Sequence, residues 1–358
     1  MNILFVGTMV PNEIEAVEDG LSSAGNRFQN NFIKHLEDNR SNNVKLLSYL
    51  AIGVSCDSEN ALPNWVTYNP DKKIDSIKAF SKQLQSEVKK ADIVICYNVI
   101  YAWLFLPIYA KRYNKKSVVI LADYSGEESY SDIGHKLYAK LMLWSVKKFN
   151  KVVGLSCDIE KKLSKNQEFV LMEGGIDEEL YEKFSDVEDA PEIKNYMYSG
   201  LLAEVTGVDV LLEAMKLNSE DITLTITGKG PLEGAVKSAS EVDARIRYLG
   251  SLPYDEYIEE LKHTDALINP RNMKLPENQN NFPSKVMDYL ATGKPIISTK
   301  FAGWENFEEN ISFIDSTAEA ISNALKVDNV RKSSVQNNRA RAKDFLWSRQ
   351  IEKIIGDN

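Results

Sequence analysis

Short runs of apolar residues alternate along the chain with longer segments that carry a single apolar face. The length of each run and its content of β-branched residues are typical of a buried strand. In the first half of the chain the runs are Asn2–Gly7, Val44–Leu50, Asp92–Tyr97, Ser117–Leu121 and Lys151–Leu155. Strands that alternate with helices in this way predict a parallel sheet with helices on both faces.

The same rhythm starts again after Phe184–Lys194, a polar and acidic segment that contains Pro191. Its composition is that of an interdomain linker. The strands predicted after it are Asn195–Ser199, Ile222–Ile226, Arg245–Leu249, Asp265–Ile268, Pro295–Ser298 and Ile311–Ile314. The pattern therefore predicts two α/β domains, at residues 1–183 and 184–338. Residues 339–358 form a helix whose apolar stripe we expect to pack back on the first domain.

Composition and charge narrow the class of protein. The 358 residues are 43% apolar and 27% charged, which is typical of a globular chain. A net charge of −9 argues against a nucleic-acid partner. Neither a signal peptide nor a membrane-spanning run is recognisable, and the three cysteines are not clustered. We therefore expect a cytoplasmic protein without a disulfide framework or a zinc site.

The chemistry is expected in the loops that follow the strands of the second domain, where open α/β sheets bind ligands. Asn269–Arg271 ends one strand, and Pro283 and Ser284 then open a helix. The free N–H groups at such a helix start favour a diphosphate. Arg271 and Lys285 add cations, and a carboxylate at Asp288 suits the two hydroxyls of a ribose. The residues alone equally allow Ser284 to be a plain helix cap, with Lys285 and Asp288 as a solvated pair.

Short motifs in a fixed order extend this picture over half of the chain. They are Met172–Asp177, Tyr198–Leu202, Gly207–Ala214, Ile226–Gly230, Tyr248–Gly250, Asp265–Arg271, Phe282–Lys285 and Tyr289–Ile297. With these motifs the chain resembles family 4 retaining glycosyltransferases, and most of all members that serve bacterial capsular or exopolysaccharide assembly. The resemblance implies the GT-B architecture, in which two Rossmann-like domains face each other across a cleft.

The resemblance also implies an activity. A nucleotide-sugar donor, for example a UDP-linked sugar, would pass its sugar with retention to a saccharide acceptor, which we expect to be lipid-linked. No essential metal or other cofactor is expected. The implied donor-binding residues are Gly25, Gly200, Gly228, Gly230, Arg271, Ser284, Lys285 and Asp288. Asp123 and Glu127 are the implied acceptor-side residues. For the glycines and for Asp123, ordinary turns and caps remain open alternatives.

The chain departs from the family pattern at several positions. Asn280 and Asp288 stand where the family has a pair of glutamates, so the residue expected to face the donor sugar is an uncharged amide. Leu201 and Thr206 occupy the places of an arginine and a lysine near the diphosphate. Arg271 and Lys285 are the candidate replacements for these cations, and with Asn280 they are the candidate catalytic residues.

A basic stretch stands out in this acidic chain. Lys136, Lys140 and Lys147 align on one face of a predicted helix that also carries leucines and Trp144, and a second basic group, at 111–116, precedes it. Such lysines can be a solvated face. Basic and aromatic residues on one helix are also what peripheral contact with an anionic membrane requires. The second interpretation places the protein on the inner face of the cell membrane.

Three other functions are alternatives to a catalytically active glycosyltransferase. A non-catalytic GT-B subunit that stabilises a partner transferase is favoured by the departures at Leu201, Thr206 and Asn280. An NAD-dependent oxidoreductase is disfavoured, because Gly7–Pro11 contains no Gly-x-Gly-x-x-Gly pattern after the first strand. A sugar-nucleotide epimerase of similar architecture is the third.

Overall fold

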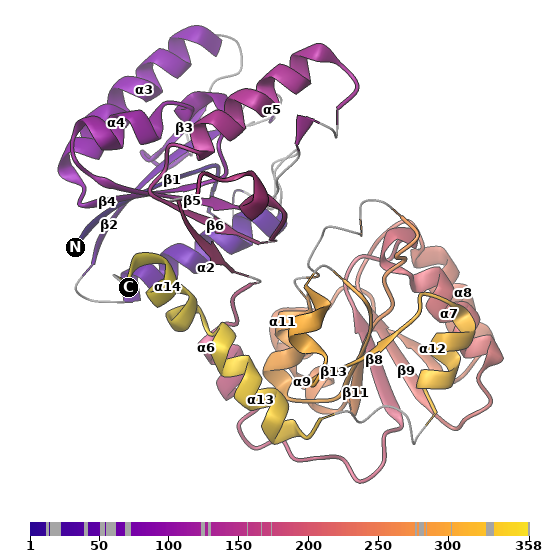
Figure 1. Cartoon of the computed structure of the whole chain (residues 1–358). Helices are drawn as coiled ribbons and strands as arrows, with labels where there is room; N and C mark the ends of the chain where they lie inside the picture. The colour runs from indigo at the N-terminus through magenta and orange to yellow at the C-terminus, as the bar shows by residue number, and fades with distance from the viewer. Residues whose placement is uncertain are drawn as a thin grey trace. The chain divides into compact units, whose positions relative to one another are not determined.

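The chain folds into two compact units. One comprises Met1–Met172 and Gln350–Asn358, and the other Glu173–Arg349. The computed structural model describes residues 1–11, 14, 23–38, 42–50, 54, 62–68, 73–122, 126–127, 130–155, 157–165, 167–172, 174–275, 278, 283, 285–301, 303–326 and 333–356. Each unit has one parallel sheet with helices on both faces (Figure 1), which confirms the predicted α/β class.

The first unit has a seven-stranded sheet of order β3-β2-β1-β4-β5-β6-β7. Its strands are β1 (Asn2–Gly7), β2 (Asn43–Leu50), β3 (Val66–Tyr68), β4 (Ile93–Tyr97), β5 (Lys116–Leu121), β6 (Lys151–Gly154) and β7 (Glu168–Leu171). Its helices are α2 (Ser23–Asp38), α3 (Lys73–Lys90), α4 (Leu106–Arg112), α5 (Ile133–Val146) and the end of α14 (Trp347–Ile355). In Figure 1, α3, α4 and α5 cover one face of the sheet, and α2 and α14 cover the other.

The second unit has a six-stranded sheet of order β10-β9-β8-β11-β12-β13. Its strands are β8 (Asn195–Ser199), β9 (Thr223–Thr227), β10 (Ile246–Tyr248), β11 (Ala266–Asn269), β12 (Ile296–Thr299) and β13 (Ile311–Ile314). Its helices are α6 (Glu178–Glu182), α7 (Val208–Leu217), α8 (Glu233–Val242), α9 (Tyr254–Lys262), α11 (Lys285–Thr292), α12 (Ala318–Ala324) and α13 (Val335–Ala342). α7, α8 and α12 lie on one face of this sheet (Figure 1).

Burial on both faces explains why the strands read as continuous apolar runs. In β1, Leu4 and Val6 belong to the core under α3 and α4, whereas Phe5 packs against Phe32 of α2 with ring centroids 5.7 Å apart. A strand covered on one face only would alternate between apolar and polar residues. The apolar runs of the sequence therefore follow from the two helical layers.

Both sheets reverse their strand order at one point. In each, the first strand is followed by strands added on one side, and the chain then returns to add the rest on the other side. The connections after β1 and β4, and after β8 and β11, thus leave toward opposite faces of their sheets. Such a switch point opens a crevice beyond the carboxyl ends of the strands, where ligands bind.

The C-terminal residues are held in the first unit by both apolar and polar contacts. Ile351 and Ile354 of α14 are buried. The buried Lys151 donates from Nζ to the carbonyl oxygens of Lys353 and Gly356, at 3.3 and 3.5 Å, and pairs with Glu168 at 2.8 Å. A cation beside the last carbonyl groups of a helix also complements its dipole.

The boundaries between the units differ from the predicted ones. The chain crosses between them after residue 172 and again after residue 349, not near residues 183 and 339. Leu180, Tyr181 and Phe184 are buried in the core of the second unit, so the acidic segment that follows them is part of that unit. The composition of the segment identified a polar loop, but the burial of α6 shows that this loop belongs to the second unit.

Candidate functional site

The loops at the switch point of the second sheet are in close contact. Gly200 follows β8, and Pro270 and Arg271 follow β11. Gly207 has a φ of +75°, and a Cβ placed on it would lie 1.9 Å from the carbonyl oxygen of Pro270. Only glycine permits this approach at that backbone conformation. The start of α7 is therefore held against the loop that carries Arg271.

Lys285, the first residue of α11, places its amine beside the loop that follows β8. The Nζ atom is buried and has no hydrogen-bond partner among the described residues. It lies 4.1 Å from the centroid of the Tyr198 ring and 3.0 Å from where a Cβ on Gly200 would be. Burial, with a smaller contribution from the Arg271 guanidinium, lowers the pKa of Lys285 to about 7. A buried amine without an acceptor is costly, and an anion bound beside it would remove that cost.

Arg271 lies close to Lys285, and Asp288 follows Lys285 one turn further along α11. Burial lowers the pKa of Arg271, which is half-buried and close enough to Tyr198 and Lys285 to interact with both electrostatically. Asp288 is half-buried in the first turn of α11. Burial, with a smaller contribution from the Asp288 carboxylate, raises the pKa of Tyr289 to about 12. The structure thus brings Arg271 and Lys285 together at the carboxyl ends of β8 and β11, whereas the Asp288 carboxylate, one turn into α11, acts on Tyr289 and Tyr254.

A hydroxyl network fixes the loop after β8. Tyr198 Oη and Thr206 Oγ1 each donate to the carbonyl oxygen of Leu201, both at 2.6 Å. Tyr289 Oη accepts from the backbone N–H of Ser199 at 3.0 Å. Thr206 therefore stabilises the loop at a position where a cation was expected from the resemblance. The roles of Tyr198 and Tyr289 were not predicted, because nothing in their spacing distinguishes them from core tyrosines.

Gly228 and Gly230 serve the packing of two loops. A Cβ on Gly228, whose φ is +133°, would lie 1.8 Å from the carbonyl oxygen of Gly200. A Cβ on Gly230 would lie 2.4 Å from the carbonyl oxygen of Leu202. The loop after β9 therefore lies directly against the loop after β8. This contact accounts for both glycines without a ligand.

The switch point of the first sheet is occupied by the chain's own side chains. Asn26 accepts from the N–H of Val10 at 2.8 Å, and Gln29 accepts from the N–H of Thr8 at 3.0 Å. Gly25 is buried in the first turn of α2, where its carbonyl oxygen accepts from Gln29 at 3.1 Å. The N–H groups of Thr8 and Val10 are therefore already hydrogen-bonded and do not form an anion site.

The other predicted residues divide into two groups. Glu127 is exposed and pairs with Lys140 at 2.9 Å. Asp123, Asn280 and Ser284 lie outside the described residues.

Within the described ranges, no three His, Cys, Asp or Glu side chains are grouped so that they could hold a metal ion. A search of the same residues finds no helix that is long and apolar enough to cross a membrane.

Sequence comparison places the second sheet in a known group of enzymes. Residues 194–326 match the family described as glycosyl transferases group 1. This unit is a glycosyltransferase domain. The matched residues include both β8 and β11, and with them Arg271, Lys285 and Asp288. The comparison with curated proteins finds no match to the sequence.

Solved glycosyltransferase structures share the fold of the whole chain. The apo form of the lipopolysaccharide outer core galactosyltransferase WaaB is 15% identical, with a TM-score of 0.64 over 99% of each chain. HepE (Alr3699) from Anabaena, in complex with UDP, is 14% identical, with a TM-score of 0.67 over 99% of each chain. A glycosyltransferase from Rickettsia africae is 16% identical, with a TM-score of 0.67 over 100% of this chain and 99% of the other. These similarities identify the fold of the glycosyltransferase as GT-B.

Proposed function

We propose that this glycosyltransferase moves a sugar from a nucleotide-sugar donor to a saccharide acceptor, with retention at the anomeric carbon. The observation that carries the proposal is the buried amine of Lys285, which has no partner among the described residues and lies beside Arg271 at the switch point. Two neighbouring cations, one of them an amine without an acceptor among the described residues, suit an anion with several oxygens. The diphosphate of a nucleotide sugar is such an anion.

The donor would lie along the carboxyl ends of β8 and β11. Its diphosphate would contact Arg271, Lys285 and the start of α11, where the helix dipole is positive. The Asp288 carboxylate, one turn into α11, would accept hydrogen bonds from the ribose hydroxyls. A UDP-linked sugar is the donor that we favour, because HepE, of the same fold, has been solved with UDP and with UDP-glucose.

During transfer, the bond between the anomeric carbon and the diphosphate oxygen breaks, and negative charge develops on the leaving group. Arg271 and Lys285 would stabilise that charge, and a protonated Lys285 does so at no extra cost in reorganisation. No protein nucleophile is required in this scheme. Asn280 would face the donor sugar through an amide, which can donate to a sugar hydroxyl but cannot carry charge.

The acceptor that we propose is a lipid-linked saccharide in the assembly of a capsule or exopolysaccharide. Asp123 and Glu127 of the first unit are the proposed acceptor-side residues. A lipid-linked acceptor would bring this otherwise cytoplasmic enzyme to the inner face of the cell membrane. A non-catalytic subunit that stabilises a partner transferase is the second candidate, because Leu201 and Thr206 replace the expected cations.

Calorimetry with nucleoside diphosphates tests the donor site. We expect UDP to bind the native protein, and Arg271→Ala and Asp288→Asn each to weaken binding by about one to two decades, since a hydrogen bond to a charged group contributes roughly 1.5–3 kcal/mol. GDP and ADP serve as comparison ligands, and each variant must melt like the native protein. Unchanged UDP affinity in both variants would place the donor elsewhere. UDP binding without hydrolysis of any UDP-sugar would favour the non-catalytic subunit.

A further inference from the structure

Large apolar side chains gather on one part of the first unit's surface. In the described part of the chain, twelve large apolar residues are exposed, and six of them lie on or beside α4 and α5. These six are Phe105, Ile108, Ile133, Leu137, Leu141 and Trp144, and we refer to them as the apolar ridge. Single exposed apolar residues are common on proteins, but a contiguous group marks an interaction surface.

The ridge is continuous along one helix and across to the next. Ile133, Leu137, Leu141 and Trp144 follow one another at intervals of four, four and three residues, so they form one stripe along α5. The stripe is about 16 Å long at 1.5 Å per residue. Ile133 is 85% exposed and Leu137 58%. Phe105, at the start of α4, meets Trp144 edge-on with ring centroids 6.1 Å apart, which joins the two helices into one surface.

Lysines border the ridge, and carboxylates are absent from its helices. Neither α4 nor α5 contains an Asp or a Glu, in a chain whose net charge is −9. Lys136 and Lys140 lie beside the stripe on α5, and Lys147 and Lys148 follow its end. Among the described residues, Lys140 is the one of these four that has an ion-pair partner. That partner is the exposed Glu127, and exposed pairs contribute little to stability. The surface thus combines apolar contact area with positive charge.

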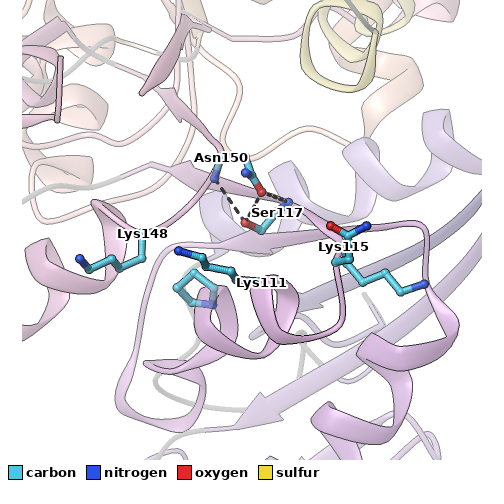
Figure 2. Close-up of a pocket in the computed structure, with 7 residues that line it drawn as sticks. Lys111, Lys115, Ser117, Lys148 and Asn150 are labelled. Atoms are coloured by element: carbon cyan, nitrogen blue, oxygen red, sulfur yellow. Dashed lines mark hydrogen bonds between the residues drawn. The ribbon is translucent and has the colours of Figure 1, made fainter. Parts of the chain in front are cut away.

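The basic end of the ridge is not built to hold a single phosphate. A cavity of about 250 Å³ lies there, lined by Pro107, Lys111, Asn114, Lys115, Ser117, Lys148 and Asn150. Asn150 Oδ1 accepts from both the backbone N–H and the hydroxyl of Ser117, each at 2.9 Å. Figure 2 shows that Lys115 and Lys148 extend to opposite sides of this pair. Cations that spread apart suit a surface with distributed negative charge better than one small anion.

We propose that the apolar ridge and its lysines form a docking surface for a membrane that contains anionic phospholipids. α5 would lie in the plane of the membrane surface, with Leu137, Leu141 and Trp144 among the acyl chains and the lysines at the level of the headgroups. A second copy of this chain fits less well, because a symmetric contact would bring the same lysines together. The purpose of docking rests on the proposed function, a transfer to a lipid-linked acceptor, whereas its physical basis does not.

Flotation with vesicles tests the surface directly. We expect the native protein to float with vesicles of phosphatidylcholine and phosphatidylglycerol, and to bind at least tenfold less to vesicles of phosphatidylcholine alone. Two triple variants should each reduce binding to the anionic vesicles by tenfold or more. One replaces apolar contact (Leu137→Ser, Leu141→Ser and Trp144→Ser), and the other reverses charge (Lys136→Glu, Lys140→Glu and Lys147→Glu).

Matched controls separate the ridge from a general change in surface chemistry. Ile74→Ser, Leu217→Ser and Val242→Ser remove three apolar residues that are exposed elsewhere, and Lys34→Glu, Lys78→Glu and Lys82→Glu reverse three charges on α2 and α3. Both control variants should float like the native protein. All four variants should bind UDP with native affinity. Their substitutions lie in the first unit or, for Leu217 and Val242, at the C-terminal ends of α7 and α8, which are at the opposite end of the sheet from the carboxyl ends of the strands. A loss of UDP binding would therefore concern the proposed function and not the docking surface.

Trp144 supplies a readout of depth. Lipids brominated along the acyl chain should quench part of the protein's fluorescence on binding, and Trp144→Phe should abolish that part of the quenching while vesicle binding persists. Native flotation by the ridge variants would overturn the proposal. So would a native protein that binds neither vesicle but forms a dimer that the ridge variants lose, since the ridge would then be a protein interface.

Discussion

The switch points of the two sheets have the same strand order but different chemistry. After β1, the N–H groups of Thr8 and Val10 are bound by Gln29 and Asn26 of the following helix. After β8, the loop is fixed by tyrosine and threonine hydroxyls, and the Lys285 amine beside it has no acceptor among the described residues. The comparison shows that topology provides the crevice, whereas side chains decide whether it is filled by the protein or available to a ligand.

The largest expected difference between the two regions is the loss of stability when a glycine is replaced by alanine. A Cβ on Gly228 would meet the backbone oxygen of Gly200 at 1.8 Å, and its φ of +133° is strained for any other residue. We expect Gly228→Ala to destabilise the protein by roughly 3 kcal/mol or more. A Cβ on Gly7 would meet the Gln29 side chain at 2.1 Å, and that side chain can move. Gly7→Ala should cost only about 1 kcal/mol.

Urea unfolding of both variants, monitored by fluorescence and circular dichroism, measures this difference. The linear dependence of the free energy of unfolding on urea gives the two values on one scale. Equal losses in the two variants would mean that the loop after β9 can withdraw from the loop after β8, contrary to the packing described above.

The next largest effect is on UDP affinity, and two variants separate it from effects on stability. Lys285→Met should weaken UDP binding by about one to two decades, because it removes a charged donor to the diphosphate. It should not lower the melting temperature, since it also removes a buried amine that has no acceptor among the described residues. Asn26→Ala should do the reverse: roughly 1–2 kcal/mol less stability, with unchanged UDP affinity.

Calorimetry and thermal melting on the same two variants complete that test. The pattern fails if Asn26→Ala weakens UDP binding as strongly as Lys285→Met does, because the first switch point would then also contact the donor. Lys285→Arg is the matched control for charge. It keeps the cation but not the shape of a single ammonium, so it should retain part of the affinity.

The smallest effect is a dependence of UDP affinity on pH. The pKa of Lys285 falls from an ordinary 10.5 to about 7 in the ligand-free protein. A bound diphosphate favours the charged amine, so binding takes up a proton and the affinity should fall as pH rises above about 7. One proton changes the affinity by at most about tenfold per pH unit. Without ligand the sign is opposite: the lysine's contribution to stability rises with pH between 7 and 10.5, because the unfolded chain holds the proton longer.

Titrations of UDP between pH 7 and 9 measure this dependence, in two buffers whose ionisation enthalpies differ, so that proton uptake is seen directly. The last phosphate ionisation, near pH 6, lies below the window. Lys285→Met should bind UDP with nearly constant affinity across it. A native protein with the same flat profile would show that Lys285 does not change its protonation on binding.

Most of the strands could be predicted from the sequence, and the exceptions have a common cause. Asn2–Gly7 and Asn195–Ser199 have the predicted bounds, because they are central strands that are buried on both faces. β3 and β7 were missed. Both are short edge strands with half-buried residues, so they leave no continuous apolar run. The domain boundary was misplaced because polar composition does not distinguish a linker from a surface loop.

The candidate site could be predicted in part. The positions of Arg271, Lys285 and Asp288 after a strand and at a helix start were read from the sequence. The structure brings Arg271 close to Lys285, and the role of all three in donor binding stays a prediction. The stacking of the Lys285 amine on Tyr198, and the use of Thr206 as a loop tie, could not be read, because both depend on contacts between segments far apart in the chain.

The sequence by itself determined the parallel α/β class, the repeat of one strand–helix rhythm, and the order of motifs that resembles a glycosyltransferase. These properties are local: they follow from the period of apolar residues and from short turns. Only the tertiary structure decided which loops meet, which N–H groups are already satisfied, and which buried amine has no acceptor among the residues that the structure describes. The reason is physical. The burial that lowers the pKa of Lys285 exists only after distant segments have packed together. The same packing decides which apolar residues of α5 stay exposed as the ridge.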